Sequence, residues 1–179
     1  MKELQVDLNI HLKEIEIADA EEIFNIINSG REYFREWLPF VDDTSDVSYT
    51  KSYVENVTGE TSNDLIFTVL YHNKLVGLVG LKDVDLGNKK TEIGYWLSES
   101  YQHKGIITQS CKALITHAFS EMGLNRIQLK AATQNFKSQR IAERLGFTSE
   151  GIERDGELHS HGFVDLNVYS LLRKEFQKA

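Results

Sequence analysis

A glycine between a strand-like and a helix-like segment is the feature of this chain that points most directly to chemistry. Residues 91–97 (TEIGYWL) predict a strand, and an amphipathic helix pattern begins near Ile107. Gly105 lies between them, in the segment 102–108 (QHKGIIT). Backbone N–H groups at a helix N-terminus have no partner inside the helix, so this arrangement predicts an anion site. A pyrophosphate group is the expected ligand.

A second cluster of polar and basic residues follows further along the chain. It begins at Asn135, continues through Ser138 and ends in Leu145-Gly146-Phe147. Asn and Ser at a helix start are explained by helix capping alone, and Asn135 can cap the helix and contact a ligand at once. Taken with the glycine segment, this cluster resembles the GNAT family of acyl-CoA-dependent N-acetyltransferases.

The resemblance rests on short motifs. The GNAT pyrophosphate loop reads Gln/Arg-x-x-Gly-x-Gly/Ala, which Gln102 and Gly105 match and from which Ile107 departs. A later helix of the family opens with Asn and ends in Leu-Gly-Phe, as this one does. The segments 92–97 (EIGYWL) and 35–40 (REWLPF) are similar to the RimL-type branch, the ribosomal-protein N-terminal (alanine/serine) acetyltransferases.

The resemblance implies acetyl-CoA as the cosubstrate. Pantetheine is expected to pair with the strand backbone at Tyr95 and Leu97. The N–H of Leu97 is then an oxyanion donor, worth about 3 kcal/mol. Lys104 is a candidate for the local positive charge that polyanionic CoA needs, whereas core packing explains the side chains of Tyr95 and Trp96. The expected cofactor-binding residues are Tyr95, Leu97, Gln102, His103, Lys104, Gly105, Ile106, Ile107, Thr108, Asn135 and Ser138.

The base and the proton donor of such a reaction are expected from the same branch. Many GNAT members carry a tyrosine four residues after the position of Ser138, where this chain has Ala142, so that role is vacant or filled from elsewhere. The RimL-type branch pairs a Ser with a Glu nineteen residues later, a spacing that Ser138 and Glu157 match. Glu157 would act as a general base through a water, and Ser138 would hold the sulfur and relay a proton. The alternative is that Glu157 is a solvated acid in a polar loop, residues 153–161.

Other reactive side chains receive simpler interpretations. Two histidines, His159 and His161, without a carboxylate or Cys partner at a known spacing rarely form a metal site. No metal is therefore expected, and these histidines are assigned to the rim of the acceptor pocket. Cys111, on the apolar stripe of the predicted helix, is interpreted as a small core residue. Asp165 either anchors the acceptor amine or occupies a solvent position on an edge strand.

Composition and charge limit the classes of protein to which this chain can belong. The 179 residues, 41% hydrophobic and 26% charged, predict one soluble globular domain over residues 1–179. The formal charge of −7 argues against a nucleic-acid-binding protein and favours a cationic acceptor. A single cysteine fits a reducing compartment, and no apolar run is long enough to span a bilayer. These features favour a cytoplasmic protein that binds neither nucleic acid nor membrane.

The elements that position these residues follow from the apolar pattern. Strands are expected at 4–17, 64–71, 74–82, 91–97, 126–131, 147–154 and 163–172, with a turn at His72-Asn73. Helices are expected from Asp19 as N-cap, over 31–38, 46–57 and 138–145, and from Ile107 to near Gly123. Strand 126–131 should lie parallel to strand 91–97. This order and the resemblance predict a GNAT-like α/β (α+β) fold. Its central sheet of about seven strands is mixed and mostly antiparallel, with helices on both faces and one parallel pair at the cofactor cleft.

The predicted function is an N-acetyltransferase that moves acetyl from acetyl-CoA to an amine by direct attack. An α-amine has a pKa near 8, so roughly a tenth is neutral at pH 7 and a weak base suffices. This favours a protein N-terminal α-amine, with a ribosomal protein as the acceptor expected from the branch. Acetylation of a small amine, a polyamine or an antibiotic, is the enzymatic alternative. A non-catalytic acyl-CoA-binding regulatory module is the other class, and assembly into a homo-oligomer stays open.

Overall fold

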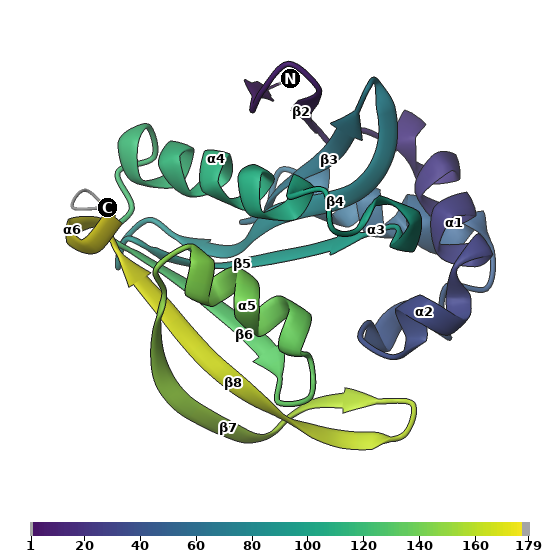
Figure 1. Cartoon of the computed structure of the whole chain (residues 1–179). Coiled ribbons are helices and arrows are strands. Elements are labelled where there is room, and N and C mark those ends of the chain that lie inside the picture. The colour runs from purple at the N-terminus through teal and green to yellow at the C-terminus, as the bar shows by residue number, and fades with distance from the viewer. Residues whose placement is uncertain (1, 177–179) are drawn as a thin grey trace.

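The computed structural model describes residues 2–176 and builds them around one eight-stranded sheet (Figure 1). The strand order is β1-β2-β3-β4-β5-β6-β8-β7, and only β5 and β6 are parallel neighbours. The strands are β1 (Glu3–Gln5), β2 (Ile10–Glu14), β3 (Leu65–Tyr71), β4 (Lys74–Asp85), β5 (Lys90–Leu97), β6 (Arg126–Ala132), β7 (Thr148–His159) and β8 (Gly162–Leu172). The expected mixed, mostly antiparallel sheet is confirmed.

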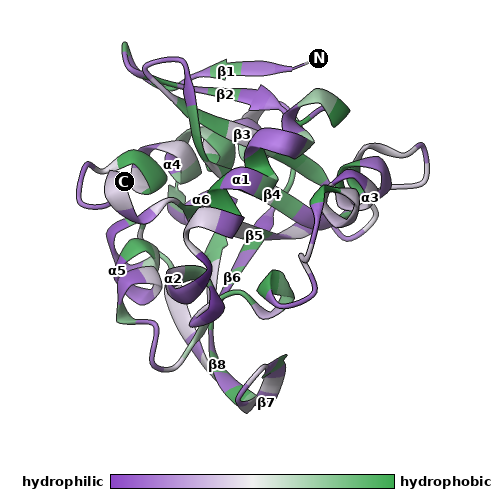
Figure 2. Cartoon of the chain, turned by 90° about the vertical axis from the view of Figure 1, so that its right-hand side faces the viewer, coloured by the Kyte–Doolittle hydropathy of each residue, from purple (hydrophilic) through white to green (hydrophobic). Residues whose placement is uncertain are grey.

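Helices cover both faces of the sheet because successive strand residues point to opposite sides. In β3, Phe67 packs in a core with α4 and α5, whereas Ile66 packs in a second core with α1, α2 and α3. Figure 2 shows hydrophilic residues on the outward side of α1, in front of the hydrophobic strands. The helices are α1 (Ala20–Ser29), α2 (Arg31–Arg35), α3 (Val47–Thr58), α4 (Ile106–Ser120), α5 (Phe136–Arg144) and α6 (Arg173–Phe176), with 3-10 turns η1 (Ile17–Asp19), η2 (Pro39–Val41) and η3 (Glu99–Tyr101). No helix within residues 2–176 is long and apolar enough to cross a membrane.

The first strand expected at 4–17 is in fact the hairpin of β1 and β2. The Asp7 side chain accepts hydrogen bonds from the backbone N–H groups of Asn9 at 2.7 Å and Ile10 at 2.8 Å. This aspartate turn reverses the chain, and Leu8 at its tip is fully exposed. Alternation of apolar and polar residues continues through the turn, so the sequence pattern conceals it. The reversal supplies the eighth strand.

Two aspartates expected at helix starts differ in what they cap. Asp46 accepts a hydrogen bond from the Ser48 N–H at 2.7 Å and is the N-cap of α3. Asp19 accepts instead from the Glu16 N–H at 2.9 Å, and this bond closes η1 rather than capping α1. The helical path thus begins one 3-10 turn earlier than predicted.

The β7–β8 hairpin is longer than the sequence predicts. β7 continues to His159, so residues 153–161 are strand and turn rather than a polar loop. The prediction was wrong because β7 lies at the edge of the sheet, where its mostly exposed side chains show no apolar alternation. β8 lies between β6 and β7, so Asp165 does not occupy an edge strand.

The strands β5 and β6 pair only at their beginnings. The parallel register joins residues 90–92 to residues 126–128 and then stops. Figure 1 shows the two strands diverging beyond this point. We call these diverging ends, residues 93–97 and 129–132, the fork. Because α4 follows β5 and α5 follows β6, both helices begin near the open side of the fork.

An ion pair joins the beginning of β7 to its neighbours in the sheet. Arg126 on β6 donates to both carboxylate oxygens of Glu150 on β7, at 2.7 and 2.5 Å, and Ser170 on β8 donates at 2.8 Å. The hydrogen bonds from Arg126 and Ser170 lower the pKa of Glu150 to about 2. A lowered carboxyl pKa stabilises the folded state above the unfolded pKa and loses this contribution as the pH falls.

We predict that Glu150→Gln lowers the free energy of unfolding at pH 7. In the variant this free energy should also change less as the pH falls. In the wild type, the contribution of Glu150 is present above about pH 4.5 and is lost as the pH falls toward about 2. The pair is partly exposed, so the difference should stay below about 1 kcal/mol. Denaturant unfolding at pH 7 and pH 3 measures it. A wild-type advantage that is as large at pH 3 as at pH 7 would contradict the assignment.

Candidate active site

The N-terminus of α4 has the geometry of the predicted anion site. Gly105 is its N-cap residue, with φ 74° and ψ 1°, in the left-handed region that favours glycine. His103 also has a positive φ, of 62°. No side chain caps the first turn of α4, so its backbone N–H groups face outward without a side-chain acceptor. These groups and the helix dipole can bind a phosphate.

The departure from the GNAT loop pattern at Ile107 does not disturb this geometry. The side chains of Ile106 and Ile107 are buried in the core, and both residues lie in the first turn of α4. Neither has a positive φ, so their N–H groups keep the helical direction. Thr108 lies in the same turn and is partly exposed. The Ile107 side chain therefore packs in the core, while the backbone N–H groups of this turn remain available as donors.

A lysine that sequence reasoning missed lies at the segment 102–108, the candidate phosphate loop. The Lys137 ammonium, in the first turn of α5, donates to Gln102 Oε1 at 3.0 Å. Gln102 Nε2 in turn donates to the hydroxyl of Tyr33 on α2. The candidate Lys104 instead has its ammonium over the rings of Tyr101, at 5.0 Å, and Tyr71, at 5.4 Å. Nothing in the local sequence marks Lys137, because α5 meets the loop only in three dimensions.

Strand β5 and helix α5 meet across the fork. Asn135 Oδ1 accepts from the Ser138 N–H at 3.1 Å, which makes Asn135 the N-cap of α5. The Ser138 hydroxyl lies 2.7 Å from the Tyr95 hydroxyl. Core packing is therefore only part of the role of Tyr95, whose hydroxyl crosses from β5 to α5. Burial raises the pKa of Tyr95, so its phenol stays protonated at neutral pH.

The backbone of Leu97 points into the fork. The Ser98 N–H donates to Val76 of β4 at 2.8 Å, and alternate residues of a strand direct their N–H groups to opposite edges. The N–H groups of Leu97 and Tyr95 therefore point away from β4, toward the side where β6 has diverged. The Trp96 side chain packs on the Phe34 ring, with centroids 5.3 Å apart, as the core interpretation expects.

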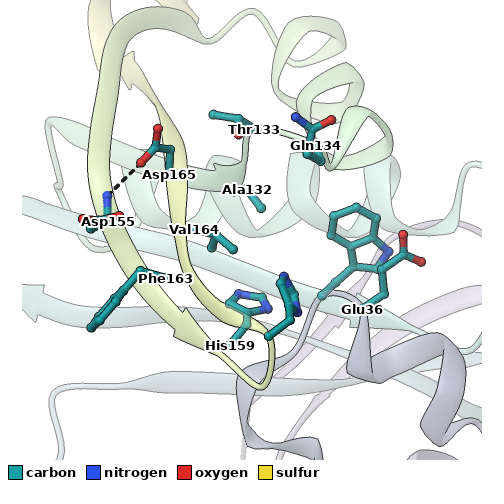
Figure 3. A pocket seen from close by; sticks show the side chains of 11 residues that line it. Glu36, Ala132, Thr133, Gln134, Asp155, His159, Phe163, Val164 and Asp165 are labelled. Atoms are coloured by element: carbon teal, nitrogen blue, oxygen red, sulfur yellow. Dashed lines mark hydrogen bonds between the residues drawn. The ribbon is translucent and has the colours of Figure 1, made fainter.

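A pocket of about 390 Å³ lies where the β7–β8 hairpin approaches α2 and η2 (Figure 3). Its lining comes from the end of α2, the end of β6 and both strands of the hairpin. The lining residues are Glu36, Trp37, Ala132, Thr133, Gln134, Asp155, His159, His161, Phe163, Val164 and Asp165. Three of these are carboxylates, and none is Lys or Arg. The pocket therefore favours a cationic ligand that also carries an apolar group.

The candidate anchor of the acceptor, Asp165, and the candidate general base, Glu157, both lie on the β7–β8 hairpin. Asp165 lines the pocket and accepts from the Asp155 N–H at 2.8 Å, as the dashed line in Figure 3 marks. Glu157 lies on β7, and its Oε2 is 2.6 Å from Nε2 of His159. Within residues 2–176, no hydrogen bond joins Ser138 to Glu157. The structure thus pairs Ser138 with Tyr95 and Glu157 with His159.

The remaining reactive groups have structural explanations. Cys111 is fully buried in the core, as predicted, and burial raises the pKa of its thiol and so suppresses the thiolate. The rings of His159 and His161 have centroids 5.4 Å apart. In the described part of the chain, no group of three or more His, Cys, Asp or Glu side chains is placed to hold a metal ion.

Comparison with known proteins identifies the family. A family model described as acetyltransferase (GNAT) domain matches residues 9–148, which is most of the chain and includes the phosphate loop, the fork and α5. The chain belongs to the GNAT family of acetyltransferases. It is an acetyl-CoA-dependent N-acetyltransferase.

Relatives over the full length of this GNAT enzyme agree with the RimL-type resemblance. The putative ribosomal N-acetyltransferase YdaF of Bacillus subtilis (strain 168) is 35% identical, over 97% of this chain and 96% of its own. The ribosomal-protein-serine acetyltransferase of Escherichia coli (strain K12) is 28% identical, over 93% and 94%. Among solved structures, the microcin C7 self immunity acetyltransferase MccE, in complex with acetyl-CoA and AMP, superposes with a TM-score of 0.86. It is 30% identical and covers 93% of this chain and 94% of its own.

We predict that Lys137→Gln weakens acetyl-CoA binding to this GNAT enzyme about fivefold, because the ammonium at Gln102 would be lost from the phosphate site. The effect should shrink at high salt, which screens an exposed charge. Calorimetric titration with acetyl-CoA at about 0.05 M and about 0.5 M salt measures both the loss of affinity and its dependence on salt. Lys104→Gln is the matched control and should bind within twofold of the wild type. A larger loss in Lys104→Gln than in Lys137→Gln would assign the phosphate contact to Lys104.

Proposed function

We propose that this enzyme acetylates the N-terminal α-amine of a protein, with a ribosomal protein as the acceptor class. The observation that carries the proposal is the acidic, partly aromatic pocket beside the fork. Carboxylates of Glu36, Asp155 and Asp165 attract an α-ammonium group, and Phe163 and Val164 suit the apolar part of a first residue. The names of the B. subtilis and E. coli relatives support a ribosomal acceptor.

The proposed position of acetyl-CoA follows from the loop and the fork. Its pyrophosphate binds the N–H groups of α4 around Gly105, together with Gln102 and Lys137. Its pantetheine runs along β5, pairing with the outward backbone of Tyr95 and Leu97 as an added strand. This places the thioester at the end of β5, where the Leu97 N–H donates to the carbonyl oxygen. Asn135 holds α5 on the opposite side.

The proposed chemistry is direct transfer. Glu157 accepts a proton from the acceptor ammonium through a water, and the neutral amine then attacks the thioester carbonyl. Negative charge develops on the carbonyl oxygen, and the Leu97 N–H stabilises it. The carbon–sulfur bond breaks, and Ser138 relays a proton: its hydroxyl gives a proton to the thiolate of CoA and takes up the second proton of the amine nitrogen, so that it ends as a hydroxyl. The Tyr95 hydroxyl of β5 lies 2.7 Å from the Ser138 hydroxyl and gives it a hydrogen-bond partner, where the usual tyrosine position holds buried Ala142.

An acceptor comparison tests the proposal. The purified enzyme is incubated with acetyl-CoA and one of three acceptors. These are a ribosomal-protein N-terminal peptide, the same peptide with a blocked N-terminus and an added lysine, and spermidine. We expect thiol release and addition of one acetyl group, by mass spectrometry, with the first peptide alone. Turnover of spermidine alone would establish the small-amine alternative. Tight acetyl-CoA binding without turnover of any of the three would overturn the proposed acceptor class.

A further inference from the structure

A buried histidine beside the proposed base has no role in the chemistry described above. His159 ends β7, its side chain is only 1% exposed, and it lines the acidic pocket (Figure 3). Glu157 lies two residues earlier, so both side chains project from the same face of the strand. Their contact, 2.6 Å between Glu157 Oε2 and His159 Nε2, joins an exposed side chain to a buried one.

The surroundings of the second ring nitrogen indicate which of the two nitrogens of His159 carries the hydrogen. Nδ1 of His159 is buried and has no hydrogen-bond partner. A protonated ring would place an N–H at this position, and a buried N–H without an acceptor is unfavourable. The neutral ring with its hydrogen on Nε2 leaves an unpaired acceptor at Nδ1 rather than an unpaired donor on a charged ring, and it donates to the Glu157 carboxylate, which is an acceptor only. His159 therefore fits the role of a neutral hydrogen-bond donor.

This bond has a consequence for the orientation of Glu157. The Glu157 side chain is 41% exposed and has several rotatable bonds, whereas the His159 ring is held by its surroundings. A bond from the ring to Oε2 restricts the carboxylate to one orientation. The other oxygen, Oε1, has no hydrogen-bond partner among residues 2–176 and remains available to a water or an amine.

We infer that His159 is a positioning residue for the general base: its Nε2–H holds Oε2 of Glu157, so that Oε1 receives the proton from the acceptor. The inference rests on the proposed function of Glu157. His159 itself exchanges no proton, and its effect on the rate passes entirely through the carboxylate. Misplacing a catalytic group by about 1 Å can cost about 100-fold in rate, which sets the scale of the effect.

Two substitutions of His159 separate the hydrogen bond from the volume of the ring. His159→Leu fills the space without a donor, and His159→Gln keeps an N–H at a similar reach. We expect kcat to fall about 10- to 100-fold in His159→Leu and to recover most of that loss in His159→Gln. The Kd for acetyl-CoA, measured by calorimetry, should match the wild type in both, because the phosphate loop lies elsewhere.

A double variant tests whether His159 acts through Glu157. The variant Glu157→Gln with His159→Leu should be no slower than Glu157→Gln alone, because groups that act as a unit are not additive. Additive losses would overturn the inference, as would equal losses in His159→Leu and His159→Gln. A fully active Glu157→Gln beside a slow His159→Leu would also overturn it, whereas failure of the wild type to transfer acetyl would refute the proposed function itself. Thermal unfolding of each variant confirms that a folded enzyme is compared.

Discussion

Replacing Gly105 by aspartate is expected to weaken acetyl-CoA binding at least about 100-fold. The substitution puts a negative charge at the N-terminus of α4, where the phosphates are proposed to bind. Two unit charges about 4 Å apart repel by about 4 kcal/mol at an effective dielectric constant near 20. Space is not the obstacle, since a Cβ at this position would meet only the Gln109 amide, at 3.5 Å. Calorimetric titration with acetyl-CoA measures the loss.

Gly105→Asn is the matched control for this prediction. Asparagine has nearly the same shape as aspartate, and both tolerate the left-handed φ of 74° better than other residues. The two variants should therefore unfold at similar temperatures, and Gly105→Asn should bind acetyl-CoA within about tenfold of the wild type. Equal loss of binding in both variants would show that backbone strain, rather than charge at the phosphate site, explains the effect.

Replacing Glu157 by glutamine is expected to lower kcat about 100- to 10,000-fold at pH 7, the usual contribution of a general base. The Kd for acetyl-CoA should not change, because Glu157 lies on β7 and the phosphate loop precedes α4. The variant should regain activity as the pH rises toward about 8, since more of an α-amine is then neutral without help. Steady-state rates between pH 6 and pH 9 with an N-terminal peptide measure both effects.

Glu153→Gln provides the control on the same strand. Glu153 makes an ion pair with Lys130 at 2.7 Å and does not line the pocket. Its substitution removes the same charge from β7 and should leave kcat within about twofold of the wild type. A Glu157→Gln enzyme that keeps wild-type activity would remove the base from the mechanism. Equal losses in the two variants would point to the net charge of β7 instead.

The sequence predicts most of the fold because helix starts, tight turns and apolar periods are local properties. His72 and Asn73 adopt the positive φ angles, 50° and 61°, of the predicted two-residue turn. The left-handed Gly105 and the N-cap of α5 at Asn135 also follow from residue type. The predicted elements were wrong where the local pattern is ambiguous. The turn at Asp7 keeps the alternation of a strand, and the exposed edge strand β7 lacks it.

The features of the candidate site also fall into two groups, those that depend on local sequence and those that depend on tertiary contacts. The sequence by itself predicted the glycine turn before α4, the cap of α5 and the succession of most elements along the chain, since each depends on residues close in sequence. Only the tertiary structure brought Tyr95 to Ser138, 43 residues away, and Lys137 to Gln102, 35 residues away. It also placed Glu36, which follows α2, and His159 of β7 in one pocket. These contacts depend on how strands order and helices pack, and distance along the chain does not encode distance between packed elements.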